Sequence, residues 1–189
     1  MELLAGRLHV ADLDSFVADL GEIGEAHDVT IQAFDPQYVA GRRHLERAVT
    51  LADRAIERGE NVARDRAVEL LCYAAGRRQI DRALEMGVDE GESDVIVLVD
   101  GPGDELAARA HLEDRFGLES VSALETVEGG VGADANGDVD VDVNANTNVD
   151  PNLNTLRSFF EISDAERAAT AASLEDLVCE RVALLEVEK

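Results

Sequence analysis

The feature that most restricts the fold is a continuous apolar run within residues 94–99 (Asp-Val-Ile-Val-Leu-Val). A strand with apolar side chains on both faces is typical of the centre of a sheet that other elements cover. Looser alternation over residues 2–10, 29–34 and 119–124 predicts further strands. The sequence therefore predicts a small mixed β-sheet with a buried central strand.

Helical periodicity separates these strands. Apolar residues recur at helical spacing over residues 12–26, 42–58, 63–75, 78–86 and 104–116. Another helix begins at Leu153, and the pairs Ser163–Glu166 and Ser173–Asp176 predict two more helix starts, the second opening a final helix over 174–187. Strands separated by helices favour an α/β sandwich of the α+β-like kind, a single domain with one small sheet packed by several helices.

Residues 128–152 differ in composition from the rest of the chain. They consist almost wholly of Gly, Val, Asp, Asn and Ala, with no basic or aromatic residue. Such a segment cannot bury enough apolar surface to fold alone, so we expect a disordered acidic insertion. Its Asp138-x-Asp140-x-Asp142 spacing imitates the start of an EF-hand loop. However, Val143 and Val149 stand where Gly and Glu are needed, so we expect no calcium site.

The chain is strongly acidic. Its formal net charge is −24 with a pI near 4.3, and Lys189 is its only lysine. Such a charge destabilises a compact state by self-repulsion unless molar salt screens it, where the Debye length is roughly 3 Å. The composition is thus typical of a halophilic protein. Cys72 and Cys179 lie in apolar helical segments and predict no disulfide, and no apolar run approaches a membrane span, so we expect a cytoplasmic protein.

Catalytic motifs are missing from the sequence. There is no P-loop, no G-x-G-x-x-G and no G-x-S-x-G. His44-Leu45-Glu46 and His111-Leu112-Glu113 fit H-x-E, but the P-C-x-x-C that completes a zinc deaminase site is absent. We therefore expect no enzymatic activity, no bound metal and no cofactor.

One part of the chain is locally basic. Residues 42–82 contain ten arginines and seven acidic residues, a local charge of +3 in a chain of −24. Two interpretations remain open at this point. The arginines could contact nucleic-acid phosphates, or they could pair with neighbouring acidic side chains on helix faces.

Three segments resemble a known family: Ile31-Gln32-Ala33-Phe34-Asp35, Val39-Ala40-Gly41-Arg42-Arg43-His44-Leu45 and Ala74-Ala75-Gly76-Arg77-Arg78-Gln79-Ile80. The third follows a helix and resembles the signature A-S-G-x-R-Q-I. Residues 181–186 also resemble that family's C-terminal helix. The family is the one that binds the kinase subunit of the KEOPS complex, to which the animal PRPK-binding protein belongs. The resemblance covers residues 1–127 and 153–189.

The resemblance implies an α/β sandwich and a non-catalytic subunit of the complex that installs threonylcarbamoyladenosine on transfer RNA (tRNA). Such subunits bind the complex's kinase/ATPase and the 3′ CCA end of tRNA, and reach the other KEOPS subunits indirectly. Carried over to this chain, the RNA contacts would be Arg42, Arg43, His44, Gly76, Arg77, Arg78 and Gln79. The kinase contacts would lie on the C-terminal helix, at Leu174, Leu177, Val178, Arg181, Val182 and Leu185.

The chain departs from the family pattern at Ala75, where the family usually has Ser, so a hydroxyl contact would be lost. The insertion before the C-terminal helices is expected to loop away. An alternative hypothesis is a purely protein–protein regulator of the kinase, in which the arginines pair internally. An unrecognised small enzyme is a third hypothesis, which the missing nucleophile, base and metal motifs disfavour.

Overall fold

The structure, a computed structural model, describes residues 1–121 and 153–186. The expected insertion at 128–152, with its calcium look-alike, lies outside these residues. So do residues 122–124 of the expected strand 119–124 and the last residue of the expected helix 174–187.

The sheet has the order β2-β3-β1-β4. Its strands are β1 (Glu2–Val10), β2 (Thr30–Phe34), β3 (Gly91–Asp100) and β4 (Glu119–Ser120). The α/β sandwich is confirmed, but the expectation of a mixed sheet is corrected, because each neighbouring pair is antiparallel. Strands β1 and β2 run in the same direction, yet β3 lies between them and runs opposite to both, so no parallel pair forms.

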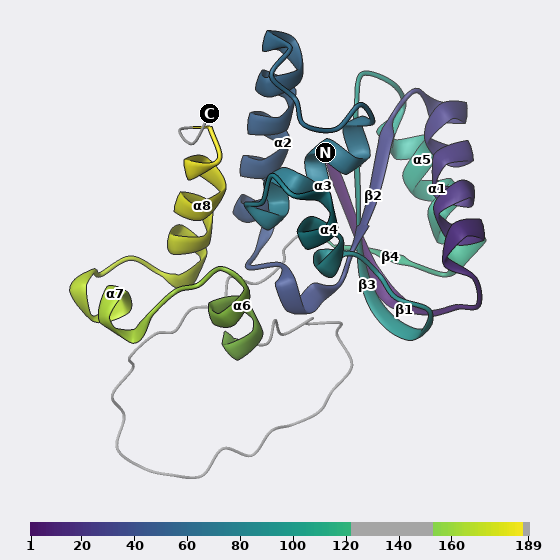
Figure 1. The fold of residues 1–189 in the computed structure, drawn as a ribbon. Helices are drawn as coiled ribbons and strands as arrows, with labels where there is room; N and C mark the ends of the chain where they lie inside the picture. The colour runs from purple at the N-terminus through teal and green to yellow at the C-terminus, as the bar shows by residue number, and fades with distance from the viewer. Residues whose placement is uncertain (122–152, 187–189) are drawn as a thin grey trace, which may run out of the picture.

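Helices cover both faces of the sheet (Figure 1). On one face lie α1 (Leu13–His27) and α5 (Glu105–Phe116), and on the other lie α2 (Arg42–Arg58) and α3 (Arg66–Ala75). Strand β3 sends alternate side chains into the two cores: Val95, Val97 and Val99 pack with α1 and α5, whereas Ile96 and Leu98 pack with α2 and α3. The apolar run therefore is the buried central strand that its pattern predicts.

The helices expected over 63–75 and 78–86 differ most from the structure, and the last helix ends at Leu184 rather than at residue 187. Helix α3 begins at Arg66 rather than at residue 63, because buried Glu69 accepts hydrogen bonds from the backbone N–H groups of Val62 and Ala63 and holds them in a loop. The expected helix over 78–86 is a short α4 (Ile80–Ala83) continued by a 3₁₀ turn, η2 (Leu84–Met86).

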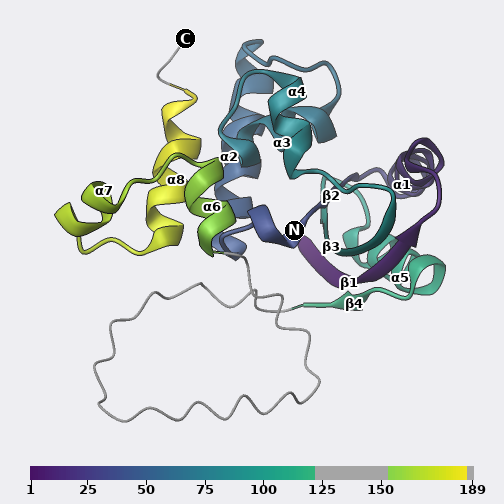
Figure 2. The ribbon, with the colours of Figure 1, turned by 60° about the horizontal axis from the view of Figure 1, so that its bottom comes forward.

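The last three helices lie on the side of α2 away from the sheet, and the last of them packs directly against α2 (Figure 2). They are α6 (Leu153–Phe159), α7 (Asp164–Ala169) and α8 (Leu174–Leu184). Ser163 and Ser173 cap α7 and α8 as predicted, and Ser173 with Asp176 forms a complete capping box. Together with the buried residue Ala40, apolar residues of this segment form a third core cluster.

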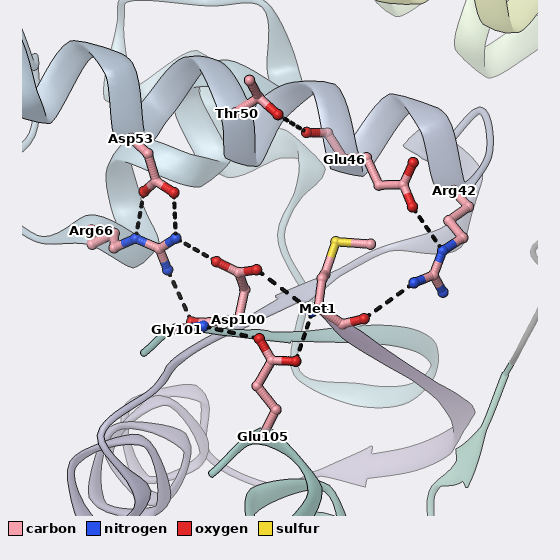
Figure 3. Close-up of polar contacts among 9 residues, drawn as sticks. All are labelled: Met1, Arg42, Glu46, Thr50, Asp53, Arg66, Asp100, Gly101 and Glu105. Atoms are coloured by element: carbon pink, nitrogen blue, oxygen red, sulfur yellow. Dashed lines mark hydrogen bonds and ion pairs between the residues drawn. The ribbon is translucent and has the colours of Figure 1, made fainter. Parts of the chain in front are cut away.

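A polar network joins α2, α3 and α5 at one end of β3 (Figure 3). The guanidinium of Arg66 donates to both carboxylate oxygens of Asp53, at 2.7 and 2.9 Å, and also to the carboxylate and carbonyl oxygens of Asp100. On the other side of Asp100, Glu105 accepts from the Gly101 N–H and from the nitrogen of Met1. The Arg66 side chain is only 25% exposed, so these bonds are partly shielded from solvent.

We expect Arg66→Ala to destabilise the fold by about 2 kcal/mol, because it leaves the carboxylates of Asp53 and Asp100 facing each other without their shared cation. Chemical denaturation at constant high salt measures the effect. The control is Arg115→Ala, which removes the exposed pair with Asp19 and should cost far less. Equal losses in the two variants would contradict the structural role of Arg66.

Candidate functional site

The turn between α3 and α4 places the predicted RNA residues at the surface. Gly76 ends α3 in the left-handed conformation, with φ of 60°. A Cβ at this position would lie 3.5 Å from the carbonyl oxygen of Arg181 in α8. That is an ordinary van der Waals distance, so it is the left-handed backbone, not the contact with α8, that favours glycine here. The chain leaves the turn with Arg77, Arg78 and Gln79 in succession.

A pocket of about 730 Å³ lies beside this turn. One side comes from the α3–α4 turn, α4 and η2, and another from α6 and the residues that follow it. Tyr38 contributes from the 3₁₀ turn η1 (Pro36–Tyr38). The lining residues are Tyr38, Arg77, Gln79, Arg82, Glu85, Asn154, Thr155, Ser158, Phe159 and Glu161.

Arg77 is central to the pocket wall. Its Nη2 donates to the carbonyl oxygen of Phe159 at 2.6 Å and to Oε1 of Glu161 at 3.0 Å. Its guanidinium carbon also lies 5.7 Å from the centroid of the Phe159 ring, which in turn meets the ring of Tyr38 edge-on at 4.9 Å. The pocket thus combines cationic, aromatic and amide groups, the set of side chains that binds unpaired nucleotides.

The predicted RNA residues do not all gather at this pocket. Arg77 and Gln79 line it, whereas Arg43 lies in a separate groove of about 600 Å³ between α2 and α8. Arg42 binds Glu46 and the carbonyl oxygen of Met1. Half-buried Arg78 forms no ion pair within the described part of the chain. Sequence reasoning missed Tyr38 and Arg82, because nothing in their local sequence indicates that the fold brings η1, α4 and α6 together.

The structure corrects the prediction that His44 contacts RNA. Its side chain is 0% exposed, so it cannot contact RNA. Nδ1 accepts from the Ala40 N–H at 3.2 Å, and Nε2 donates to the Ala74 carbonyl oxygen at 2.7 Å, which requires the neutral imidazole with its proton on Nε2. Burial lowers the pKa of His44 to about 4, partly opposed by the bond to Ala74. The residue joins the start of α2 to the end of α3.

Glu175, which the sequence analysis did not single out, lies at the N-terminus of α2. It is 1% exposed, and its carboxylate approaches Gly41 so closely that a Cβ there would clash with Oε1. Burial raises the pKa of Glu175, while the guanidinium of Arg43 and the amides at the start of α2 oppose that shift. Helix α2 has no capping side chain of its own, so a carboxylate from α8 takes the place where negative charge is favourable.

The structure also corrects the prediction that the apolar residues of the C-terminal helix face the kinase. The five apolar ones (Leu174, Leu177, Val178, Val182 and Leu185) are each at most 5% exposed and pack into the protein itself. Arg181 donates to the carbonyl oxygen of Phe160 and to Glu166, so it also serves the internal structure. Their i, i+3, i+4 spacing marks one helix face. The first three of the apolar residues pack with apolar residues of 156–162, whereas Val182 and Leu185 join the core between the sheet, α2 and α3. The outer side of α8 instead carries Glu180 and Leu184, the latter 44% exposed.

Most arginines of the basic segment form ion pairs among the described residues. Seven of the ten do so: Arg42, Arg43, Arg54, Arg58, Arg66, Arg77 and Arg82. Several partners come from distant parts of the chain, such as Asp176 for Arg43 and Glu186 for Arg54. Internal pairing therefore accounts for most of the local positive charge.

Comparison with known proteins identifies a family. The model of a family described as kinase binding protein CGI-121 matches residues 10–186, which is nearly the whole chain. No curated protein matches the chain significantly. Among the described residues, no helix combines the length and the apolar character that a membrane crossing requires.

We expect the free energy of unfolding to decrease as the pH is lowered from 6.5 to about 4, because His44 stays neutral in the folded protein over this range. Between pH 6.5 and about 4, His44 binds a proton in the unfolded state but not in the folded state. Over this range the difference lowers the free energy of unfolding by about 3 kcal/mol. His44→Gln should lose this component, whereas the exposed control His111→Gln should keep it. Urea unfolding at fixed salt from pH 7 to pH 4 compares them, and parallel curves for both variants would contradict the burial of neutral His44.

Proposed function

The chain belongs to the kinase binding protein CGI-121 family, and from this membership we propose that it is a non-catalytic subunit of the KEOPS complex in tRNA modification. In this proposal it binds the kinase/ATPase of the complex and the 3′ CCA end of tRNA. The family match over residues 10–186 is the observation that carries the kinase-binding part. The RNA-binding part rests on the composition of the pocket beside Gly76.

The kinase-binding surface proposed here is the outer side of α8 with the adjoining groove against α2. Leu184 is an exposed apolar side chain on α8, and Arg43, Arg47 and Glu180 line the groove. Arg47 forms no ion pair among the residues that the structure describes, so its guanidinium is available to a partner. An apolar anchor beside charged groups is a common arrangement at protein–protein interfaces.

The pocket suits a single-stranded RNA end. Bases that extend beyond a duplex can stack on aromatic rings, here those of Tyr38 and Phe159, and can bond through their edges to amide groups such as that of Gln79. Arg77 and Arg82 offer planar forks for phosphate oxygens. The stacking and base-edge contacts keep most of their value at molar salt, where counterion release adds little to RNA affinity.

The alternative of a purely protein–protein regulator is favoured by the ion pairs. Arg42 and Arg43, two of the residues proposed for RNA, are bonded to Glu46 and Asp176, and an RNA phosphate would have to compete with those carboxylates. In this alternative the pocket has no RNA ligand, and the chain acts only by supporting the kinase. Direct binding measurements separate the two functions.

Binding of tRNA at high salt tests the RNA role, with intact tRNA compared with tRNA that lacks its 3′ CCA. We expect trimming to abolish binding, and Gln79→Ala to weaken binding of intact tRNA by about 2- to 10-fold, which corresponds to one lost hydrogen bond. Gln37→Ala, an exposed amide that lies outside the pocket, is the matched control. Equal affinity for intact and trimmed tRNA would favour the regulator alternative.

We expect Leu184→Arg to weaken binding to the KEOPS kinase by at least about 10-fold without changing the unfolding midpoint, because the side chain is exposed and contributes little to the core. Val17→Arg makes the same change at a 57% exposed position on α1 and should leave binding intact. Calorimetry with the purified kinase measures both. Full affinity in a folded Leu184→Arg variant would rule out this side of α8.

A further inference from the structure

The turn after α6 brings a carboxylate to the proposed RNA pocket. Glu161 lies in the left-handed region, with φ of 54°, which is uncommon for a residue other than Gly, Asn or Asp. Its side chain is 75% exposed, yet Oε1 lies 3.0 Å from Nη2 of Arg77 at the pocket wall. The exposed carboxylate thus lies against the central cation of the pocket.

The turn is held in place without this carboxylate. Arg77 Nη2 donates to the carbonyl oxygen of Phe159, and Arg181 Nε donates to that of Phe160 at 3.1 Å. Arg181 is itself fixed by Glu166, with both carboxylate oxygens 2.8 Å from Nη2. In addition, the Ile162 N–H donates to the Arg157 carbonyl oxygen. Backbone bonds from two arginines and one amide therefore define the turn, and the Glu161 side chain is free for another role.

A carboxylate and a phosphate present similar oxygens to a guanidinium, and each can accept its N–H bonds. Glu161 therefore occupies the position at Arg77 that an RNA phosphate would take. Arg82, the other arginine of the pocket, is likewise paired with a pocket residue, at 2.8 Å from Glu85. The cationic groups of the pocket are thus already matched by internal anions.

We propose that Glu161 is a specificity-determining residue, an internal competitor that an anion must displace from Arg77 before it can bind. This inference rests on the proposed RNA-binding function of the pocket. A simple anion gains little by exchanging one carboxylate for another oxygen anion. A nucleotide chain that also stacks on Tyr38 and Phe159 gains those contacts in addition, so it still binds after meeting the cost of displacing Glu161, whereas a free phosphate that contacts only Arg77 does not.

The test compares Glu161→Gln with Glu22→Gln, which removes the same charge at an exposed position on α1. The probes are inorganic pyrophosphate and a short RNA that ends in CCA, at one fixed salt concentration. Arginine side-chain NMR of Arg77 and calorimetry report binding. We expect Glu161→Gln to bind pyrophosphate roughly 3- to 10-fold more tightly than the wild type, because the competing pair and its repulsion of the anion are gone. Affinity for the RNA should rise by a smaller factor, because a phosphodiester carries one negative charge and the Glu161 carboxylate repels it less than the more highly charged pyrophosphate.

The outcomes separate this inference from the function on which it rests. If the wild type binds the RNA at Arg77 but Glu161→Gln binds pyrophosphate no more tightly than Glu22→Gln, the competitor role is wrong and the RNA role stands. If pyrophosphate binding rises in Glu161→Gln while the RNA binds to neither form, the competitor role stands and the RNA role is wrong. Failure of every form to bind either probe overturns both.

Discussion

Strand β3 lies between β1 and β2 with apolar side chains on both faces, so each face must be kept from water. Val95, Val97 and Val99 require one layer of helices, and Ile96 and Leu98 require another. Full burial of one such side chain contributes about 1.5–3 kcal/mol. Each helix layer is therefore fixed to the sheet by several kcal/mol, and the surface features described above depend on where those layers lie.

The C-terminal helices depend on this arrangement indirectly, through their contacts with α2 and α3. Helix α2 is fixed by the sheet, and its N-terminus receives Glu175 from α8 at Gly41, where a Cβ would clash with the carboxylate, while Gly76 ends α3 in the left-handed conformation. His44 joins the two helices from inside through Ala40 and Ala74. Residues that resemble a binding motif in sequence thus serve as docking points between layers. The pocket and the α2–α8 groove are consequences of this docking.

The strongly acidic composition hides how the arginines of this chain are used, because most of them pair with acidic side chains of the same chain. Acidic residues outnumber basic ones by 41 to 17, so an arginine has many potential partners. Pairs such as Arg43–Asp176 and Arg77–Glu161 join segments far apart in the chain and reduce the basic character of residues 42–82. Neither the charge count nor the helical spacing could predict these pairs, because their partners come from helices whose positions only the tertiary structure defines. An RNA ligand must gain more from stacking and hydrogen bonding than it loses in displacing the pairs.

By itself the sequence determined the fold class and most of the elements, because apolar periodicity and turn residues are local signals, and its motifs resemble the family that the chain belongs to. The bounds of α2 and the caps at Ser163 and Ser173 match the structure. It did not determine the pairing direction in the sheet or the orientation of α8, where Leu177 and Val182 face inward. Nor did it indicate that His44 is buried or that Tyr38 and Phe159 meet across a pocket. Those features depend on contacts between segments distant in the chain, and only the packing of the helices against the sheet and one another decided them.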